Sequence, residues 1–164
     1  MKKYVAFIPA ILLLVACGST STKTSSPRPT IIVEGWSNRN DHYYKLTDSM
    51  TWSEVEAQAV KWGGHLVTIN DSEEELWLKN QFGYQEYFWI GFNDIVAEGI
   101  WVWANGETIT YTNWCEGEPN NLDVVTNREE DSAILNWGAN GTYGDCWNDI
   151  LSDDKRRSIV EKFP

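Results

Sequence analysis

Two cysteines, each beside a tryptophan and near a cluster of oxygen-bearing side chains, constrain the fold of this chain more than any other feature. Residues 113–121 read NWCEGEPNN and residues 144–149 read GDCWND. In an oxidising compartment, an isolated pair such as Cys115 and Cys146 most simply forms one disulfide. A thiolate metal site is the weaker alternative, because neither histidine of the chain lies near either cysteine in the sequence. A disulfide would bring two oxygen-rich segments together.

Length and composition predict one compact domain with a strong negative charge. The chain has 164 residues, and its ten tryptophans and seven tyrosines supply large burial areas for a single core. The formal net charge is −11, and acidic residues crowd residues 115–154, where Arg128 is the single base. Such a domain is a poor candidate for binding nucleic acid or anionic lipid surfaces. The acidic segment either repels itself or binds cations.

The first residues have the pattern of a targeting signal. Two lysines precede an apolar stretch that is too short to span a membrane comfortably, and residues 14–17 read LVAC. This ending resembles the bacterial lipoprotein box, which implies a lipoprotein signal peptide over residues 1–16 and a lipid such as palmitate on Cys17. An ordinary secretory signal, cut at a small residue, is the alternative.

The segment that begins at Cys17 contains almost no apolar residues. Residues 17–30 are rich in Ser, Thr and Pro, which predicts a tether, so the folded domain is expected over residues 31–164. Gly18 rather than an aspartate follows the cysteine, and by resemblance to enteric lipoproteins this implies the outer membrane. The expected location is therefore the bacterial cell envelope, with the domain lipid-anchored.

Periodicity in the remaining sequence predicts an α+β domain. Thr51 and Glu54 form a capping box that opens one helix, and a second helix begins at Asp71 and stops at Gly83. Short strands are expected over 42–46, 65–69, 87–92, 132–137, 142–149 and 156–162, and a hairpin is expected between 101–103 and 108–114. Residues 115–131 form a long polar loop, and long loops in compact domains are usually functional.

The oxygen donors of this loop favour a calcium site. An Asn-Asp pair after the second cysteine extends the set, which is Glu116, Glu118, Asn120, Asn121, Asp123, Glu129, Glu130, Asp131, Asn148 and Asp149. Calcium takes roughly six to eight oxygen ligands, whereas zinc and copper prefer imidazole or thiolate. A solvated acidic loop is the simpler alternative, but the mixture of amides with acids and the second segment weigh against it.

Several motifs, in order along the chain, resemble the C-type lectin domain over about residues 36–163. They are Trp52, GGHLV at 63–67, WIG at 89–91, Trp101, YTNW at 111–114, EPN at 118–120 and WND at 147–149. Each motif alone is weak, but the ordered series is specific. The resemblance implies the C-type lectin fold, with two helices, short antiparallel β-sheets and a long calcium-binding loop region.

The resemblance also implies a principal calcium site made by the EPN triplet, a later glutamate of the loop and the WND triplet. The corresponding residues are Glu118, Asn120, Glu130, Asn148 and Asp149. Pro119 is then expected to follow a cis peptide bond. Because the loop is a few residues longer than in animal lectins, Glu129 or Asp123 could take the place given to Glu130.

In sugar-binding members of that family, two hydroxyls of a sugar complete the calcium shell. The resemblance implies Glu118, Asn120 and Asn148 as the sugar-binding residues. The EPN order implies mannose-type ligands, meaning mannose, glucose, fucose or N-acetylglucosamine.

An auxiliary calcium site is implied as well. Its residues would be Asp94, Glu98, Asn121 and Asp131, with Glu130 shared. Loop acids in water are the alternative interpretation.

The two disulfides that are usual in the family are missing from this sequence. The corresponding positions hold Ala59 with Val160 and Ser132 with about Ser152. Cys115 and Cys146 instead flank the segments with the implied ligands, so their disulfide is expected to hold the two halves of the site together.

Taken together, these patterns predict a calcium-dependent carbohydrate-binding module on a cell surface and no enzyme. A protein-binding domain of the same family, with calcium in a structural role, is the alternative. A glycosidase that used Glu118 and Asp149 would need one carboxyl group as an acid, but carboxylates that share a calcium ion stay ionised.

Overall fold

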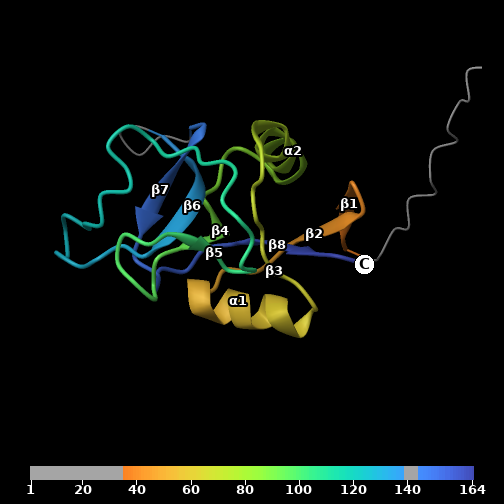
Figure 1. The fold of residues 1–164 in the computed structure, drawn as a ribbon, viewed down its shortest axis with the longest axis horizontal. Coiled ribbons are helices and arrows are strands. Elements are labelled where there is room, and N and C mark those ends of the chain that lie inside the picture. Colours follow the sequence, from red (N-terminus) through yellow and green to blue (C-terminus); the bar gives the residue numbers. More distant parts are fainter. Residues whose placement is uncertain (1–34, 139–143) are drawn as a thin grey trace, which may run out of the picture.

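The computed structural model describes residues 35–138 and 144–164 (Figure 1). The predicted signal peptide over 1–16, the tether over 17–30 and the lipidated Cys17 lie outside these residues, so these boundaries stay predictions. Neither helix of the described part combines the length and the apolar character that are needed to span a membrane.

Two helices and two antiparallel sheets form the described part of the chain, which confirms the predicted α+β class. The helices are α1 (Trp52–Lys61) and α2 (Ser72–Phe82). The strands are β1 (Ser37–Arg39), β2 (His42–Leu46), β3 (His65–Leu66), β4 (Phe88–Asn93), β5 (Val102–Trp103), β6 (Ser132–Trp137), β7 (Cys146–Ile150) and β8 (Ile159–Lys162). The strand orders are β1-β2-β8-β3 and β5-β4-β6-β7. Figure 1 shows α1 and α2 on opposite sides of β8, and the second sheet beside them.

Helix α1 begins at the predicted capping box. The Thr51 side chain accepts a hydrogen bond from the Glu54 N–H, and the Glu54 carboxylate accepts one from the Thr51 N–H. Trp52, Val55 and Ala59 recur at helical spacing, and all three are buried. The face of the helix that the periodicity predicted to be buried therefore faces the interior.

We expect Thr51→Ala to lower the free energy of unfolding by about 1 kcal/mol, because the first turn of α1 loses a side-chain acceptor. Chemical denaturation of the two proteins measures this difference. Ser53→Ala, at an exposed position of the same helix, is the control and should change the free energy by less than about 0.5 kcal/mol. Equal losses in both variants would contradict the role given to the cap.

Helix α2 buries charged residues, which the sequence did not indicate. Glu74, Glu75 and Lys79 are 4%, 3% and 5% exposed, whereas Leu76 is 55% exposed. Buried charges persist in folded proteins only when they are paired and hydrogen-bonded. The partners of these charged side chains must therefore lie on the inner face of α2 or on the segments that pack against it.

The predicted hairpin between 101–103 and 108–114 is wrong. Strand β5 pairs with β4, and residues 108–114 contain no strand. Side chains of this segment donate hydrogen bonds to Glu75 on α2, and Trp114 forms a parallel backbone bridge with Trp147. Residues 108–114 therefore bond to α2 and β7 and not, as expected, to β5.

Tryptophans form the core beneath the loops, as predicted. The ring of Phe92 is the centre of this cluster, with centroids 4.5–5.8 Å from those of Trp101, Trp103, Trp114 and Trp147. Aromatic pairs in such tilted and edge-to-face arrangements stabilise a core beyond the area that they bury. The loops therefore rest on a layer of closely packed aromatic rings.

Packing and hydrogen bonding replace the two disulfides that are missing from the sequence. Ala59 on α1 and Val160 on β8 are fully buried in one apolar cluster. The hydroxyl groups of Ser132 and Ser152 hydrogen-bond to each other at 2.7 Å. Apolar packing between α1 and β8 therefore takes the place of the missing bridge, as the sequence predicted.

Candidate functional site

A disulfide joins the two segments that the sequence singled out. Cys115 and Cys146 are bonded, with their Cα atoms 5.0 Å apart. Beside the bridge, the N–H of Cys115 donates to the carbonyl of Trp147 at 2.9 Å, and the N–H of Trp147 donates to the carbonyl of Asn113 at 2.7 Å. The segment that precedes the EPN triplet therefore runs alongside β7, which carries the Asn-Asp pair.

Asp149 on β7 connects the same two segments a second time. Its side chain is buried, and its oxygens accept from the N–H groups of Asn120, at 3.2 Å, and Asn121, at 2.7 Å. The Glu118–Pro119 peptide bond is cis, as the resemblance implied. The Asn120 amide also donates to the Glu118 carboxylate. The loop and the strand thus meet as one hydrogen-bonded unit.

These segments line a pocket of about 290 Å³. Four of the five residues that were implied as the principal site are in its lining, namely Glu118, Asn120, Glu130 and Asn148. The fifth, Asp149, is held against the loop backbone by the two hydrogen bonds described above. The structure therefore brings all five residues together.

The structure places Glu130, rather than Glu129, in the pocket. Glu130 is 6% exposed, and its N–H donates to the side chain of Asn121 at 2.9 Å. Glu129 is exposed and is absent from the lining. Asp123 does line the pocket, but its carboxylate accepts three hydrogen bonds within its own turn. Of the three candidates, Glu130 has the geometry that fits the implied ligand.

The pocket is electrostatically suited to a cation. Burial raises the pKa of Glu118 to about 7, and the neighbouring Asp149 carboxylate adds to this rise. Burial also raises the pKa of Glu130 to about 7, with nearby carboxylates contributing. The Oδ1 of Asn148 is buried without a hydrogen-bond partner. A bound cation would offset the crowded negative charge and give this oxygen a partner, and the oxygen donors present are those that calcium prefers.

A second group of acids corresponds to the implied auxiliary site. Asp94, Glu98 and Asp131 each place one carboxylate oxygen within 4.8 Å of the others. Asp94 is buried with its Oδ1 unpaired, and burial raises its pKa. Asn121, which was also implied here, accepts its hydrogen bond from the N–H of Glu130. The structure therefore brings together three of the four carboxylates of the implied set, and Glu130 is not in this group.

The pocket has lining residues that the sequence analysis missed. These are Leu122, Val124, Trp137, Ile150, Leu151, Asp154 and Arg156. Val124 is 86% exposed, and the valine pair at 124–125 in an otherwise polar loop was the available signal. Arg156 brings a base to the lining and pairs with Asp154 at 2.9 Å. Apolar surface and one positive charge therefore adjoin the oxygen donors.

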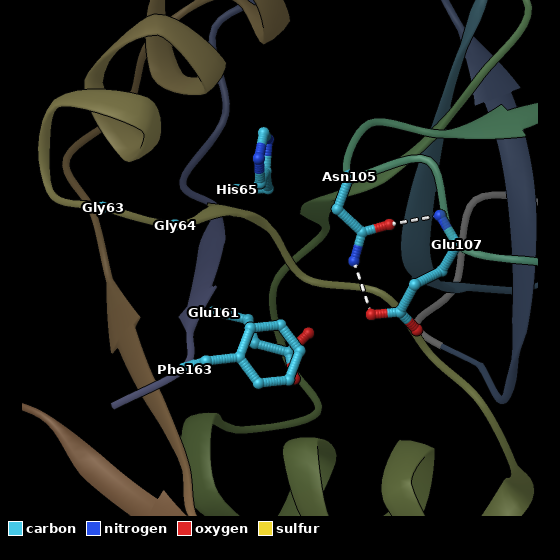
Figure 2. A pocket seen from close by; sticks show the side chains of 7 residues that line it. All are labelled: Gly63, Gly64, His65, Asn105, Glu107, Glu161 and Phe163. Atoms are coloured by element: carbon cyan, nitrogen blue, oxygen red, sulfur yellow. Dashed lines mark hydrogen bonds between the residues drawn. The ribbon is translucent and has the colours of Figure 1, made fainter.

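Another pocket of about 290 Å³ shares no lining residue with the first (Figure 2). Figure 2 shows Asn105 and Glu107 hydrogen-bonded to each other on one side of it, with Glu161 and Phe163 across from them. The Glu161 carboxylate accepts from the N–H of Thr68 at 3.1 Å. No lining residue of this pocket has a buried polar side-chain atom without a partner. It therefore lacks the buried, unpaired oxygen that the first pocket has.

Comparisons with known proteins find relatives along most of the chain. A perlucin-like protein of Mytilus galloprovincialis is 33% identical over 136 residues, which cover 77% of this chain and 79% of that protein. A type-2 ice-structuring protein of Brachyopsis segaliensis is 28% identical over 146 residues, which cover 88% of this chain and 80% of that protein.

Solved structures with the same fold include receptor domains and an antifreeze protein. The carbohydrate-recognition domain of a human scavenger receptor C-type lectin has a TM-score of 0.70 at 31% identity, over 79% of this chain and 97% of that one. A calcium-independent type II antifreeze protein scores 0.68 at 27% identity, over 81% and 95%. The C-type lectin domain of murine dendritic cell inhibitory receptor 2, solved in complex with an N-glycan, scores 0.67 at 25% identity, over 80% and 98%.

These relatives correct the predicted location. They are animal proteins, some of them receptor domains, and none is a bacterial envelope protein. The predicted bacterial outer-membrane location is therefore wrong. The lipoprotein form, with its palmitate and lipid anchor on Cys17, has no support in these comparisons. The predicted location rested on four residues, LVAC, and on the glycine that follows them, a pattern too short to establish it.

The family itself is shown by a domain model. The model of the lectin C-type domain matches residues 48–159, which include both helices and both oxygen-rich segments. Proteins of this family bind ligands and do not catalyse reactions, in agreement with the sequence-based conclusion that the chain is not an enzyme. This chain belongs to the C-type lectin domain family.

Proposed function

We propose that this domain binds mannose-type sugars through a calcium ion. The ion would be held by Glu118, Asn120, Glu130, Asn148 and Asp149. The observation that supports this most is the side chain of Asn148, which lines the pocket and has a buried oxygen without a partner. A buried polar atom of this kind costs stability unless a ligand pairs with it.

Calcium suits these donors better than other metals do. Carboxylate and amide oxygens on loops are the usual calcium ligands, whereas zinc favours thiolate and imidazole. The two nearby cysteines are in a disulfide, so neither offers a thiolate. Magnesium keeps several waters and is usually held by one or two carboxylates, fewer than this pocket provides.

A second calcium ion at the Asp94, Glu98 and Asp131 cluster is part of this proposal. Its support is the short distance between the three carboxylates, together with the buried and unpaired Oδ1 of Asp94. An ion there would offset the repulsion that helps to raise the pKa of Asp94.

Sugar binding is supported by the kind of side chain around the ion. Carboxylates accept hydrogen bonds from sugar hydroxyls and asparagine amides donate to them, and the pocket presents both, from Glu118, Asn120 and Asn148. The EPN order is the one that goes with mannose-type ligands in the family that this chain resembles. A shallow site buries little of a single sugar, so we expect a dissociation constant of about 1 mM.

The competing possibility is a protein-binding domain in which calcium only orders the loops. The calcium-independent antifreeze neighbour has the same fold, so the fold alone does not require calcium. The set of oxygen donors around one pocket favours the first proposal, because a loop that is merely structural does not require them to converge.

Calorimetric titration of the purified domain with calcium, followed by mannose, tests the proposal. We expect calcium to bind first, mannose to bind only to the calcium-loaded protein, and EDTA to abolish both signals. Galactose at the same concentration is the matched control and should give a much weaker signal. Absence of calcium binding would contradict the proposal, and calcium binding without any signal on a glycan array would favour the protein-binding alternative.

A further inference from the structure

Helix α2 carries a buried ion pair that the proposed function does not use. The Nζ of Lys79 lies 2.6 Å from the Oε1 of Glu75, and the two side chains are 5% and 3% exposed. Neither residue lines the oxygen-lined pocket. Removing one partner of such a pair is strongly destabilising, because it leaves the other charge buried and uncompensated.

Each member of the pair is hydrogen-bonded to a different segment of the site. We call residues 113–121 the loop arm and residues 145–149 the strand arm. The Glu75 carboxylate accepts from the Asn113 amide at 2.9 Å and from the Tyr111 hydroxyl, just before the loop arm, at 2.8 Å. The Nζ of Lys79 donates to the carbonyl of Asp145, at the start of the strand arm, at 3.0 Å. One ion pair thus contacts both arms.

These contacts lie where the two arms first come together. The Asn113 amide also donates to the carbonyl of Asp145, so the two arms share a hydrogen bond at this level. The disulfide follows directly, between Cys115 on the loop arm and Cys146 on the strand arm. The implied calcium ligands come next on each arm, beginning with Glu118 on the loop arm. The ion pair, the shared hydrogen bond and the disulfide therefore form successive ties at the start of the two arms, before the residues that line the pocket.

We infer that Glu75 and Lys79 are positioning residues that set the spacing of the two arms and thereby tune calcium affinity from outside the pocket. The predicted effect on calcium affinity rests on the proposed function. The predicted effect on the arms rests only on the hydrogen bonds. Partners that orient metal ligands without touching the metal typically change affinity by roughly 10-fold to 100-fold when they are removed. A buried, fully partnered pair provides such orientation because its members have few alternative geometries.

Helix α2 offers a matched control beside the pair. Glu74 is the preceding residue, is equally buried, and accepts from the Tyr44 hydroxyl at 2.7 Å and from the N–H of Asn70 at 2.9 Å. None of these partners belongs to either arm. Glu74→Gln and Glu75→Gln therefore make the same chemical change at neighbouring buried positions, but only the second change concerns the arms.

The first readout is calcium affinity by titration, measured well below the unfolding temperature of every variant. In Glu75→Gln one acceptor oxygen becomes a donor and Lys79 keeps only the exposed Asp145 carboxylate, at 3.8 Å, as a counter-charge, so we expect calcium to bind about 10-fold more weakly. Glu74→Gln should leave calcium affinity within about twofold of wild type, whatever it does to stability. Tyr111→Phe removes one hydrogen bond to Glu75 and should shift affinity in the same direction by less. It serves as the test if Glu75→Gln does not fold.

The second readout needs no calcium. Amide hydrogen exchange of the Cys115 and Trp147 N–H groups, which pair the two arms, should speed up in Glu75→Gln and in Tyr111→Phe but not in Glu74→Gln. The N–H groups of Thr47 and Val67, which bond across the first sheet, provide the internal reference. Unchanged exchange in the arms would overturn the inference, as would unchanged calcium affinity in a protein that binds calcium. If the wild type binds no calcium, the proposed function fails and the effect on calcium affinity fails with it; the exchange comparison then decides whether the pair sets the spacing of the arms.

Discussion

Replacing Asn148 by alanine is expected to weaken calcium binding at least about 100-fold, while the calcium-free protein keeps nearly its full stability. Asn148 lies on β7 with its side chain in the pocket and its Oδ1 buried and unpaired. In the calcium-free protein this oxygen costs about 1–3 kcal/mol, so its removal offsets much of the packing that the truncation loses. The variant therefore separates the effect of losing a calcium ligand from the effect of losing stability.

Asn136 is the matched control for this prediction. It is also a buried asparagine whose Oδ1 has no partner, but it does not line the pocket, and its amide donates to the carbonyls of Gly83 and Glu86, at 3.1 and 2.9 Å. Asn136→Ala should therefore lower stability and leave calcium affinity unchanged, the reverse of Asn148→Ala. Calcium titration and chemical denaturation of both variants give the comparison. Wild-type calcium affinity in Asn148→Ala would show that the site is wrongly assigned.

Removal of the disulfide has the second large expected effect. The bridge joins residues separated by 31 positions, and in the chain-entropy model a loop of this length stabilises the fold by about 3–4 kcal/mol. The double variant Cys115→Ser/Cys146→Ser should lose about this much free energy of unfolding. It should also bind calcium more weakly, because both arms must then be ordered when the ion arrives.

Two measurements separate these effects of the bridge. Near-ultraviolet circular dichroism reports the aromatic core, and we expect it to change little in the double variant, since Trp114 and Trp147, which lie beside the cysteines, also pack against Phe92. Calcium titration reports whether the two arms still form the calcium site. Lower stability with wild-type calcium affinity would mean that the bridge stabilises the fold without shaping the site.

Local signals in the sequence were enough to predict several elements of the fold. The capping box at Thr51 set the start of α1, and the apolar run 132–137 matched β6 residue for residue. Short or polar elements were less predictable. Strand β1 (Ser37–Arg39) has no apolar pattern and was missed. The strand expected over 65–69 is limited to His65–Leu66, because the Val67 carbonyl accepts from Gly91 and the Thr68 N–H donates to a side chain.

The sequence predicted which residues form the candidate site, but it did not predict the residues that hold them in place. The ordered motifs indicated which oxygens converge, but only the folded structure, in which Glu130 is buried in the pocket lining and Glu129 is exposed, distinguishes the two. The buried pair Glu75 and Lys79 gave no signal, since charged residues in a helix are expected on its solvent face. Their burial depends on partners about forty to seventy residues away in the chain, which local patterns do not contain.

The position of β8 has a consequence for the order in which this domain forms on the ribosome. Strand β8 lies between β2 and β3 and pairs with both, whereas β2 and β3 do not pair with each other. The His42 and Glu161 side chains, which meet across this sheet, are 119 positions apart in the chain. The first sheet therefore cannot be completed until nearly all of the domain has been synthesised, and until then β2 and β3 lack their common partner. During translation, the emerging chain would need protection at these two strands more than at its loops.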